Sequence, residues 1–249
     1  MIALNDNECT LSTDNCDANA TCTNTVGSFT CACNVGYNGD GVTCTDDNEC
    51  ILLTDNCDAN AACTNIPVGS FTCECNAGYR GDGVTCTVCM DYLGMENGTI
   101  PDGNIQASSE YKSIYSASKG RLNGELSSWH AAPFQTGPIW IQADIGILTY
   151  VSGVITQGDG YINKAGADYV TSFKVSTFLI TGANEVFVED KNEKAIIFLG
   201  NVDQHAEVTT IFPEPVFARI VRIICLTKFR DYCALRFEIL GCKNDYIDT

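Results

Sequence analysis

Three oxygen-bearing side chains near the boundary between two cysteine-rich repeats have the types needed to hold a hard cation. Asp46 and Glu49 lie just before the second repeat, and Asn65 lies within it. The first repeat carries a matching set, which is Asn5, Glu8 and Asn24. Oxygen-only ligand sets favour calcium, which takes about six to eight oxygens in a flexible geometry. The pattern predicts one structural Ca²⁺ site per repeat; the alternative is that these side chains only solvate a surface.

An Arg-Gly-Asp sequence at Arg80, Gly81 and Asp82 is the second feature with a chemical meaning, because integrins read this tripeptide. The first repeat has Asn-Gly-Asp at the equivalent place, 38–40. Gly-Asp-Gly is typical of tight turns, where glycine adopts positive φ and aspartate bonds to nearby backbone. Two interpretations therefore stand, a cell-attachment site and a turn template that carries arginine at its variable position.

Little in the sequence suggests catalysis. His130 and His205 are the only histidines, and no HExxH, GxSxG or phosphate-cradling loop occurs. The Cys-x-Cys spacings at 31–33 and 73–75 are not the CxxC pairs of zinc sites. We expect a protein that is not an enzyme.

The net charge of −17 is unevenly distributed. Residues 1–88 hold 12 acidic residues and one basic residue, and the remainder holds 19 acidic and 13 basic residues. Affinity for nucleic acid comes mainly from neutralising phosphates, so this charge argues against a nucleic-acid partner. It also gives no long-range attraction to anionic lipid.

Cysteine usage indicates an oxidising compartment. Of the 16 cysteines, 12 lie between Cys9 and Cys86 at regular spacing, which is typical of disulfide-linked extracellular proteins. No apolar run reaches the ~18 residues of a membrane helix, and a signal peptide is absent from this chain. We therefore expect an extracellular protein, either secreted or the ectodomain of a longer chain of which this is a part.

Residues 9–44 and 50–86 are two copies of one unit. The segment Thr-Asp-Asn-Cys-Asp-Ala-Asn-Ala at 13–20 recurs at 54–61, and Gly-Ser-Phe-Thr-Cys at 27–31 recurs at 69–73. Units this small cannot bury a sufficient apolar core, so disulfides must stabilise them. Six cysteines allow 15 pairings, and spacing alone does not choose among them.

The remainder of the chain, from Cys89, has short β-rich runs at 139–145, 151–156, 172–179, 195–199, 208–212, 218–225 and 235–240. Gly, Asn, Asp and Pro separate these runs, and no long helical period occurs among them. The pattern predicts an all-β sandwich or jelly roll.

The two repeats resemble calcium-binding epidermal-growth-factor (EGF) modules, since each has Cys-x-Cys, then Gly-Tyr-x-Gly and a last cysteine. The resemblance implies pairing of the first cysteine with the third, the second with the fourth and the fifth with the sixth. The implied bridges are Cys9–Cys22, Cys16–Cys31, Cys33–Cys44, Cys50–Cys63, Cys57–Cys73 and Cys75–Cys86.

The same resemblance adds backbone carbonyls to the calcium ligands. In the first module they are those of Asp6, Thr25 and Ser28, and in the second those of Asp47, Ile66 and Ser70. The second module is one residue longer between Asn65 and Ser70 than the first is between Asn24 and Ser28. This departure makes the carbonyl assignment in the second module the less secure of the two.

Residues 89–242 resemble the coagulation factor V/VIII C-type, or discoidin, domain. The resemblance is carried by Leu-Gly-Met-Glu-Asn-Gly at 93–98, Gln-Ala-Ser-Ser at 106–109, Trp-Ile-Gln-Ala-Asp-Ile-Gly at 140–146 and Leu-Arg-Phe-Glu-Ile-Leu-Gly-Cys at 235–242. It implies a disulfide Cys89–Cys242, which leaves Cys225–Cys233 as a local pair. Trp129 and Trp140 are expected in the core.

Recognition in the discoidin family uses loops at one end of the barrel, which map to 110–119, 131–137 and 159–168. Their apolar or aromatic tips are Ile114, Tyr115, Phe134, Tyr161 and Ile162. Asn19 and Asn97 each begin an Asn-x-Thr sequon for N-glycosylation, which fits a secreted glycoprotein.

The sequence thus predicts a mainly β protein with two small disulfide-rich EGF-like modules, 5–45 and 46–87, a discoidin-type β-sandwich or jelly-roll barrel, 88–243, and a tail, 244–249. We expect a non-catalytic adhesion or recognition protein whose calcium-stiffened modules space a discoidin domain that binds a cell-surface or matrix glycan or protein. The alternative is a bridge from phosphatidylserine membranes to integrins through the loop tips and the Arg-Gly-Asp turn.

Overall fold

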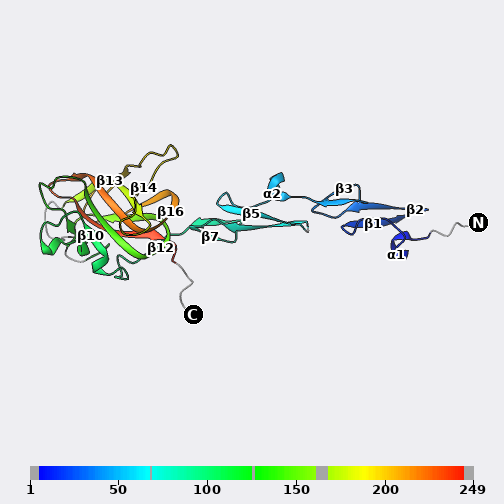
Figure 1. Ribbon diagram of the computed structural model, residues 1–249, viewed down its shortest axis with the longest axis horizontal. Coiled ribbons are helices and arrows are strands. Elements are labelled where there is room, and N and C mark those ends of the chain that lie inside the picture. Colours follow the sequence, from blue (N-terminus) through cyan, green and yellow to red (C-terminus); the bar gives the residue numbers. More distant parts are fainter. Residues whose placement is uncertain (1–5, 68, 125–126, 161–167, 244–249) are drawn as a thin grey trace, which may run out of the picture. The chain divides into compact units, whose positions relative to one another are not determined.

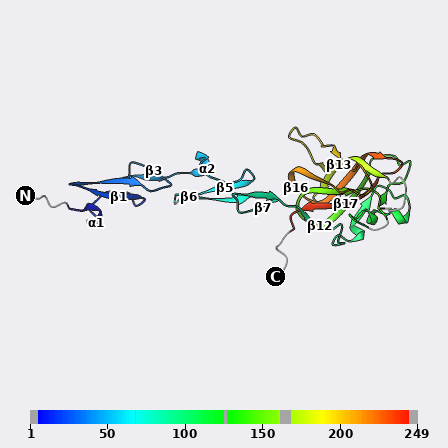
Figure 2. The ribbon, with the colours of Figure 1, turned by 180° about the vertical axis from the view of Figure 1, so that it is seen from behind.

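The computed structural model describes residues 6–67, 69–124, 127–160 and 168–243 (Figures 1 and 2). The chain divides into two compact units, residues 1–76 with 80–87, and residues 77–79 with 88–249. We call residues 9–44 the first module, 50–86 the second module and 89–242 the β domain. Among the described residues, no helix has the length and apolar character to cross a bilayer.

Each module is a one-turn helix followed by two small hairpins. Asn7 and Asn48 cap the helices, because their side chains accept hydrogen bonds from Thr10 N and Ile51 N. The first module contains α1 (Glu8–Leu11), β1 (Ala20–Thr25), β2 (Ser28–Cys33), β3 (Tyr37–Gly39) and β4 (Cys44–Asp46). The second contains α2 (Glu49–Leu52), β5 (Ala61–Ile66), β6 (Ser70–Cys75), β7 (Tyr79–Gly81) and β8 (Cys86–Val88).

Disulfides take the place of an apolar core in the modules. Of the described residues before Cys86, none belongs to the buried apolar set. The structure joins each module by three bridges in the pairing that the EGF resemblance implies, Cys9–Cys22, Cys16–Cys31, Cys33–Cys44, Cys50–Cys63, Cys57–Cys73 and Cys75–Cys86. Each bridge is worth about 2–4 kcal/mol, in the usual account by restricting the unfolded chain.

The extra residue of the second module lies in a hairpin turn. Thr25 pairs with Ser28 in the first module, and Ile66 pairs with Ser70 in the second. In the rest of both hairpins the pairing has the same register, with Asn24 opposite Phe29 and Asn65 opposite Phe71. The insertion therefore leaves the residues on both strands in equivalent positions.

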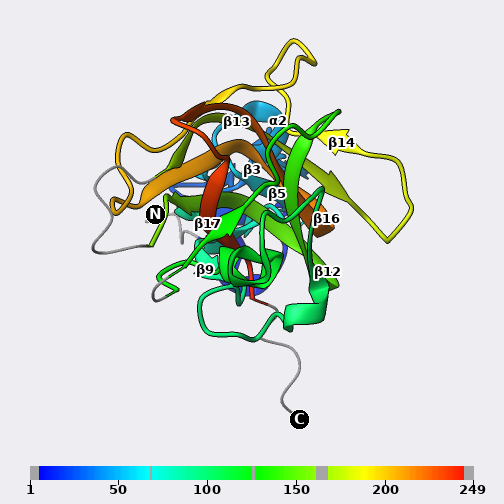
Figure 3. The same ribbon diagram turned by 90° about the vertical axis from the view of Figure 1, so that its left-hand side faces the viewer.

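The β domain is an antiparallel sandwich in which long curved strands surround one core (Figure 3). The strand order is β11-β17-β12-β16-β13-β14, with β10 beside β12, β9 beside β17 and β15 beside β13. The strands are β9 (Asp91–Tyr92), β10 (Ile105–Ala107), β11 (Trp129–His130), β12 (Ile139–Gln157), β13 (Tyr169–Phe178), β14 (Val186–Phe187), β15 (Phe198–Leu199), β16 (Val208–Phe229) and β17 (Ala234–Gly241), with 3₁₀ turns at Asp102–Asn104, Ser113–Tyr115 and Ala117–Gly120.

This architecture confirms the predicted fold class. The runs expected at 139–145 and 151–156 are one strand, β12, and those at 208–212 and 218–225 are also one strand, β16. Both strands change register along their shared ladder, between Asp144 and Thr149 and again between Val151 and Gly153. Such bulges bend a strand and increase its twist. The apolar pattern of the sequence is therefore interrupted at the bulges, although each strand continues through them.

The two tryptophans occupy different environments, and the expectation that both lie in the core is wrong for Trp140. Trp129 is fully buried, and its indole nitrogen donates to Ser109 O at 2.9 Å. On β12, Ile141 and Ala143 face the core with no exposed surface. Alternation along the strand therefore turns Trp140 to the outer face of the sheet, where the Arg222 guanidinium lies 4.1 Å from its ring centre.

Two buried charged residues of β17 hold the surrounding loops in place. Glu238 is fully buried, and its carboxylate accepts from the backbone nitrogens of Gly94, Met95 and Glu96 at 3.2, 3.0 and 2.8 Å. Arg236 donates to the carbonyls of Gly158, Gly124 and Gln204. Burial lowers the pKa of the Arg236 guanidinium, and the negative charges of Asp159 and Glu207 oppose that effect.

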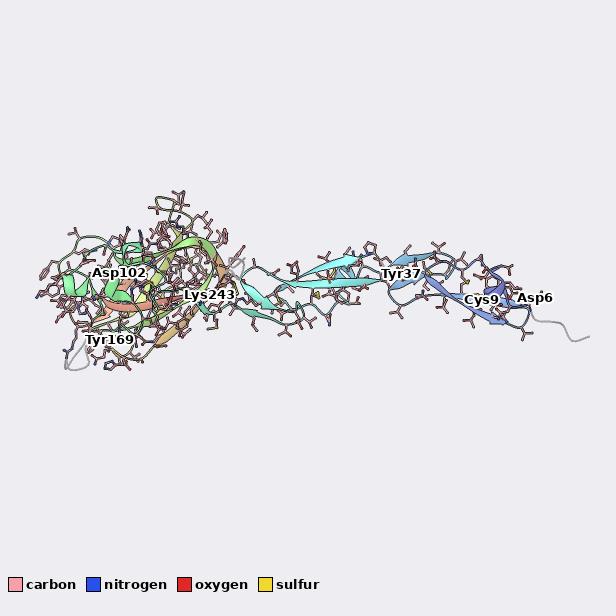
Figure 4. The ribbon with its side chains drawn as sticks, turned by 90° about the horizontal axis from the view of Figure 1, so that it is seen from below. Asp6, Cys9, Tyr37, Asp102, Tyr169 and Lys243 are labelled. Carbon is pink, nitrogen blue, oxygen red and sulfur yellow. A yellow bond between two sulfur atoms is a disulfide. The ribbon has the colours of Figure 1, made fainter. Side chains whose placement is uncertain are left out.

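Two further disulfides lie in the β domain. Cys89–Cys242 joins its two ends, whose Cα atoms are 4.9 Å apart, and Cys225–Cys233 joins β16 to the residue before β17. β9 pairs with the end of β17 beside the first of these bridges, Asp91 opposite Gly241. Lys243, which follows Cys242, and Tyr169, at the start of β13, lie toward different ends of the β domain (Figure 4).

We predict that Glu238→Gln destabilises the β domain by about 1–3 kcal/mol, because an amide group would turn a donor toward backbone N–H groups that then lack an acceptor. Urea unfolding followed by near-ultraviolet circular dichroism measures this loss. Glu193→Gln, on an exposed turn, is the matched control and should leave the unfolding midpoint unchanged. Equal midpoints for both variants would contradict the structural role of Glu238.

Candidate functional site

Among the described residues, each module has two buried side-chain oxygens without a hydrogen-bond donor, one from a glutamate at the helix start and one from an asparagine on the first strand. Glu8 and Glu49 are the first residues of α1 and α2. Their Oε2 atoms are buried, as are the Oδ1 atoms of Asn24 and Asn65, and in the described part of the chain none of the four accepts a hydrogen bond. A desolvated oxygen without a partner is costly, so these atoms need a cation or ordered water.

Asp46 connects the modules at the second of these places. Its Oδ2 accepts from Asn65 Nδ2 at 2.8 Å and its Oδ1 from Gly69 N at 2.7 Å. Because the Asn65 amide nitrogen is used in this way, its oxygen is the atom left without a donor. Asp47 N, the next backbone amide, donates to Gly36 O of the first module at 2.9 Å.

The donor set fits a divalent cation that prefers oxygen. The donor atoms of Asp46, Glu49 and Asn65 are carboxylate and amide oxygens, and the Asp46 and Asn65 side chains are hydrogen-bonded to each other. In each hairpin the terminal pair is next to the asparagine, with Thr25 and Ser28 adjoining Asn24 and with Ile66 and Ser70 adjoining Asn65. Asp6 is exposed, and Asn5 lies outside the described residues.

Two other groups of potential metal ligands come together in the described residues, Asp14 with Cys16 and Cys22, and Asp55 with Cys57 and Cys63. All four cysteines are in disulfides, so no thiolate is available. In addition, the Asp14 and Asp55 carboxylates each accept from a backbone amide two residues ahead. These groups are therefore structural.

The Arg-Gly-Asp segment is exposed but held in its own turn. Asp82 Oδ1 accepts from Val84 N and Thr85 N at 3.0 and 2.8 Å. Asp40 makes the same two bonds in the first module, to Val42 N and Thr43 N, and these bonds lower the pKa of the Asp40 carboxyl. The same turn therefore occurs in both modules, and one carboxylate oxygen of Asp82 already accepts hydrogen bonds from the backbone.

Aromatic stacking joins the expected recognition loops of the β domain. Tyr115 is half-buried, and its ring lies 4.2 Å from that of His130, which is itself buried. His130 Nε2 lies 3.6 Å from Asp159 Oδ1 at the start of the third loop. Ile114 is exposed. Tyr161 and Ile162 lie outside the described residues.

A fourth loop, 230–233 between β16 and β17, lies at the same end and was not anticipated from the sequence. Asp168 Oδ1 accepts from Asp231 N and Tyr232 N at 2.7 and 3.1 Å. The Tyr232 ring lies 4.9 Å from the Tyr111 ring, and the hydrogen bond between them raises the pKa of Tyr232. The spacing of Cys225 and Cys233 was the available signal, because a short closed loop between strands holds its side chains in place.

The first, second and fourth loops, with Ile139 and Lys228, line a groove of about 670 Å³, which is in the size range of ligand sites. Its aromatic lining residues are Tyr111, Phe134 and Tyr232, and its polar ones include Gln135, Lys228 and Asp231. Phe134 is fully exposed and has φ +61°, a conformation that is strained for an aromatic residue. The loop end thus combines aromatic surface, hydrogen-bonding groups and one cation.

The two sequons differ in accessibility. Asn97 is exposed in the turn after β9, and its side-chain oxygen accepts from Thr99 N at 3.0 Å. Asn19 is half-buried, and its backbone carbonyl accepts from Asn34 N. Of the two, the side chain of Asn97 offers more room for a glycan.

Family comparisons match both parts of the chain. The EGF domain model matches residues 9–44 and 50–86, and the F5/8 type C domain model matches residues 104–239. Neuropilin-1 of Homo sapiens is 35% identical over 159 residues, which is 64% of this chain and 17% of that protein. Lactadherin of Mus musculus is 34% identical over 163 residues, which is 62% of this chain and 34% of that protein.

Among solved structures, recombinant discoidin II of Dictyostelium discoideum aligns with a TM-score of 0.48 at 24% identity, covering 56% of this chain and 55% of that one. The chain spans about a sixth of the length of neuropilin-1 and about a third of lactadherin.

We predict that Gly69→Ala loosens the joint between the modules, whereas Gly27→Ala does not. The two glycines lie in equivalent hairpin turns of the second and first modules with φ of +72° and +77°, so the backbone strain on substitution is similar. A Cβ at Gly69 would lie 2.8 Å from Tyr37 Cε2, whereas one at Gly27 has nothing within 4 Å. Tyr37 lies at the end of the first module that leads into the second (Figure 4).

Limited proteolysis between Cys44 and Asp47, read by mass spectrometry, measures this loosening. Faster cleavage in Gly69→Ala than in Gly27→Ala is expected. Equal cleavage rates would show that Tyr37 does not lock the joint.

Proposed function

The chain belongs to the F5/8 type C domain family and carries two EGF-like modules before that domain; from this we propose that it is a non-catalytic extracellular recognition protein. Calcium-loaded modules stiffen the segment ahead of the β domain. The loop end of the β domain binds a glycan or protein of a cell surface or the extracellular matrix. The observation that carries the recognition role is the groove of the loop end, together with the fully exposed Phe134 beside it.

The extracellular setting is supported by the eight disulfides and the absence of a free cysteine among the described residues. Structural disulfides persist in oxidising compartments and are reduced in the cytosol. Because the described residues of the modules include only Cys86 in the buried apolar set, the fold of the modules depends on such a compartment.

The calcium proposal rests on the buried oxygens that lack a donor. Asn5, Glu8 and Asn24 would hold one ion with the carbonyls of Asp6, Thr25 and Ser28. Asp46, Glu49 and Asn65 would hold the other with the carbonyls of Asp47, Ile66 and Ser70. The second site is the stronger, because Asp46 supplies a full charge where the first site has neutral Asn5. A bound ion would neutralise oxygens that otherwise repel one another at the joint.

A second candidate function is binding to phosphatidylserine membranes, combined with integrin attachment through Arg80, Gly81 and Asp82. One observation favours it. Phe134 has the exposure of a side chain that inserts into lipid, worth roughly 1.5–3 kcal/mol when buried. Liposomes with and without phosphatidylserine separate this candidate from the first, and Arg80→Glu tests the integrin arm.

We predict that Glu49→Gln weakens calcium binding at the second site by about 10- to 100-fold, because a charged ligand is replaced by a neutral one. Isothermal titration calorimetry at constant ionic strength measures the affinity. Glu74→Gln is the matched control, since it removes the same charge from an exposed position of the same module. Equal weakening by both variants would indicate only a general effect of net charge.

We also predict that Phe134→Ser lowers binding to the ligand found on a glycan array or on liposomes by about tenfold or more, because a solvent-exposed aromatic side chain buried on binding is lost. Ile180→Ser is the control, since Ile180 is exposed in the turn between β13 and β14. Undiminished binding by Phe134→Ser would place the recognition surface elsewhere.

A further inference from the structure

A second hollow lies on the outer face of the β domain. Across β12, β16 and β13, the ladder sets Trp140 opposite Ile224 and Ile224 opposite Lys174. Their chain neighbours Ile141, Ile223 and Phe173 face the core, so this row points outward. The row forms part of a hollow of about 380 Å³, whose other lining residues are Pro138, Glu185, Phe187, Arg222, Cys225 and Leu226. None of its lining residues lines the groove of the loop end.

Arg222 supplies a wall of this hollow but no free charge. Its guanidinium lies between the rings of Trp140 and Phe178, 4.1 and 4.6 Å from their centres. It donates to Gln142 Oε1 at 2.9 and 2.7 Å and pairs with Glu185 Oε1 at 3.2 Å. The carboxylate of Glu185 therefore neutralises the Arg222 charge.

Lys174 is the remaining charged group of the hollow. Its ammonium lies 5.7 Å from the centre of the Phe187 ring. Within the described ranges, no carboxylate lies at ion-pair distance from it. A half-buried ammonium beside apolar walls, without an anion of its own chain, is complementary to an anion supplied by a ligand.

We propose that this hollow binds a small amphipathic anion, that is, an apolar ring or short alkyl chain carrying one carboxylate or sulfate. The apolar body packs against Ile224, Phe187 and Leu226, and the anionic group pairs with Lys174. The volume suits a ligand of this size. A cationic ligand would be repelled by Lys174, and a neutral one would leave its charge without a partner. This site is independent of calcium and of the loop end.

Tryptophan fluorescence provides a direct readout of binding. The protein has two tryptophans, of which Trp129 is fully buried and Trp140 lines the hollow. The probes are 4-phenylbutyrate, 4-phenylbutan-1-ol and acetate, which carry the apolar body with the charge, the body alone and the charge alone. Saturable change with 4-phenylbutyrate, about tenfold tighter than with the alcohol, and no change with acetate are expected.

Four variants assign the response. Lys174→Met keeps the apolar stem but removes the charge, so the preference for 4-phenylbutyrate over the alcohol should disappear. Lys191→Met, on an exposed turn, should leave it unchanged. Trp140→Phe should abolish the fluorescence response while calorimetry still detects binding. Lys174→Gln should match Lys174→Met, which separates loss of charge from altered packing.

Several outcomes would overturn the proposal. They are no saturable response in the unmodified protein, equal affinity for 4-phenylbutyrate and the alcohol, and an unchanged preference in Lys174→Met. A fluorescence response that persists in Trp140→Phe would place the binding at another site. None of these results bears on the groove of the loop end, because the two sites share no residue.

Discussion

Oxygen atoms withdrawn from water need a positive partner, and this constraint governs the EGF-like modules. Glu8, Asn24, Glu49 and Asn65 each bring one such atom to the end of a module. In modules that bury almost no apolar surface, disulfides fix each unit internally but leave the link between units to a few contacts. Asp46 connects the two by its bonds to Asn65 and Gly69. The cation proposed for this place would convert mutual repulsion into the strongest inter-module interaction available.

The β domain also contains buried charged groups, and it satisfies them with backbone hydrogen bonds. Its buried carboxylate, Glu238, is surrounded by backbone N–H groups, and its buried guanidinium, Arg236, by backbone carbonyls. Each charge thereby fixes segments distant in sequence and makes the loop positions reproducible. A rigid scaffold of this kind can hold strained or exposed side chains such as Phe134 without loss of order.

The sequence was informative where a repeat, a motif or an alternating pattern constrained the backbone. The repeated cysteine spacing, the oxygen donors and the β-rich runs predicted the modules, their joint and the mainly β class. Alternation along 139–145 sets Trp140 on the same face as Gln142 and Asp144, but the expectation for Trp140 followed the general preference of tryptophan for buried positions instead. The groove beside the fourth loop, with Tyr232 of that loop and Lys228 of β16, and the hollow around Lys174 were also missed, because each is assembled from segments distant in sequence.

The Cys89–Cys242 bridge has a mechanical consequence. The polypeptide enters and leaves the β domain at one point, where the two Cα atoms are 4.9 Å apart. Tension applied through sequence on both sides of the domain would therefore pass along a covalent sulfur link and bypass the hydrogen-bonded ladders of β12, β16 and β17. Under shear, such a domain would transmit load without being unravelled, and its loops would keep their shape while the tether is pulled.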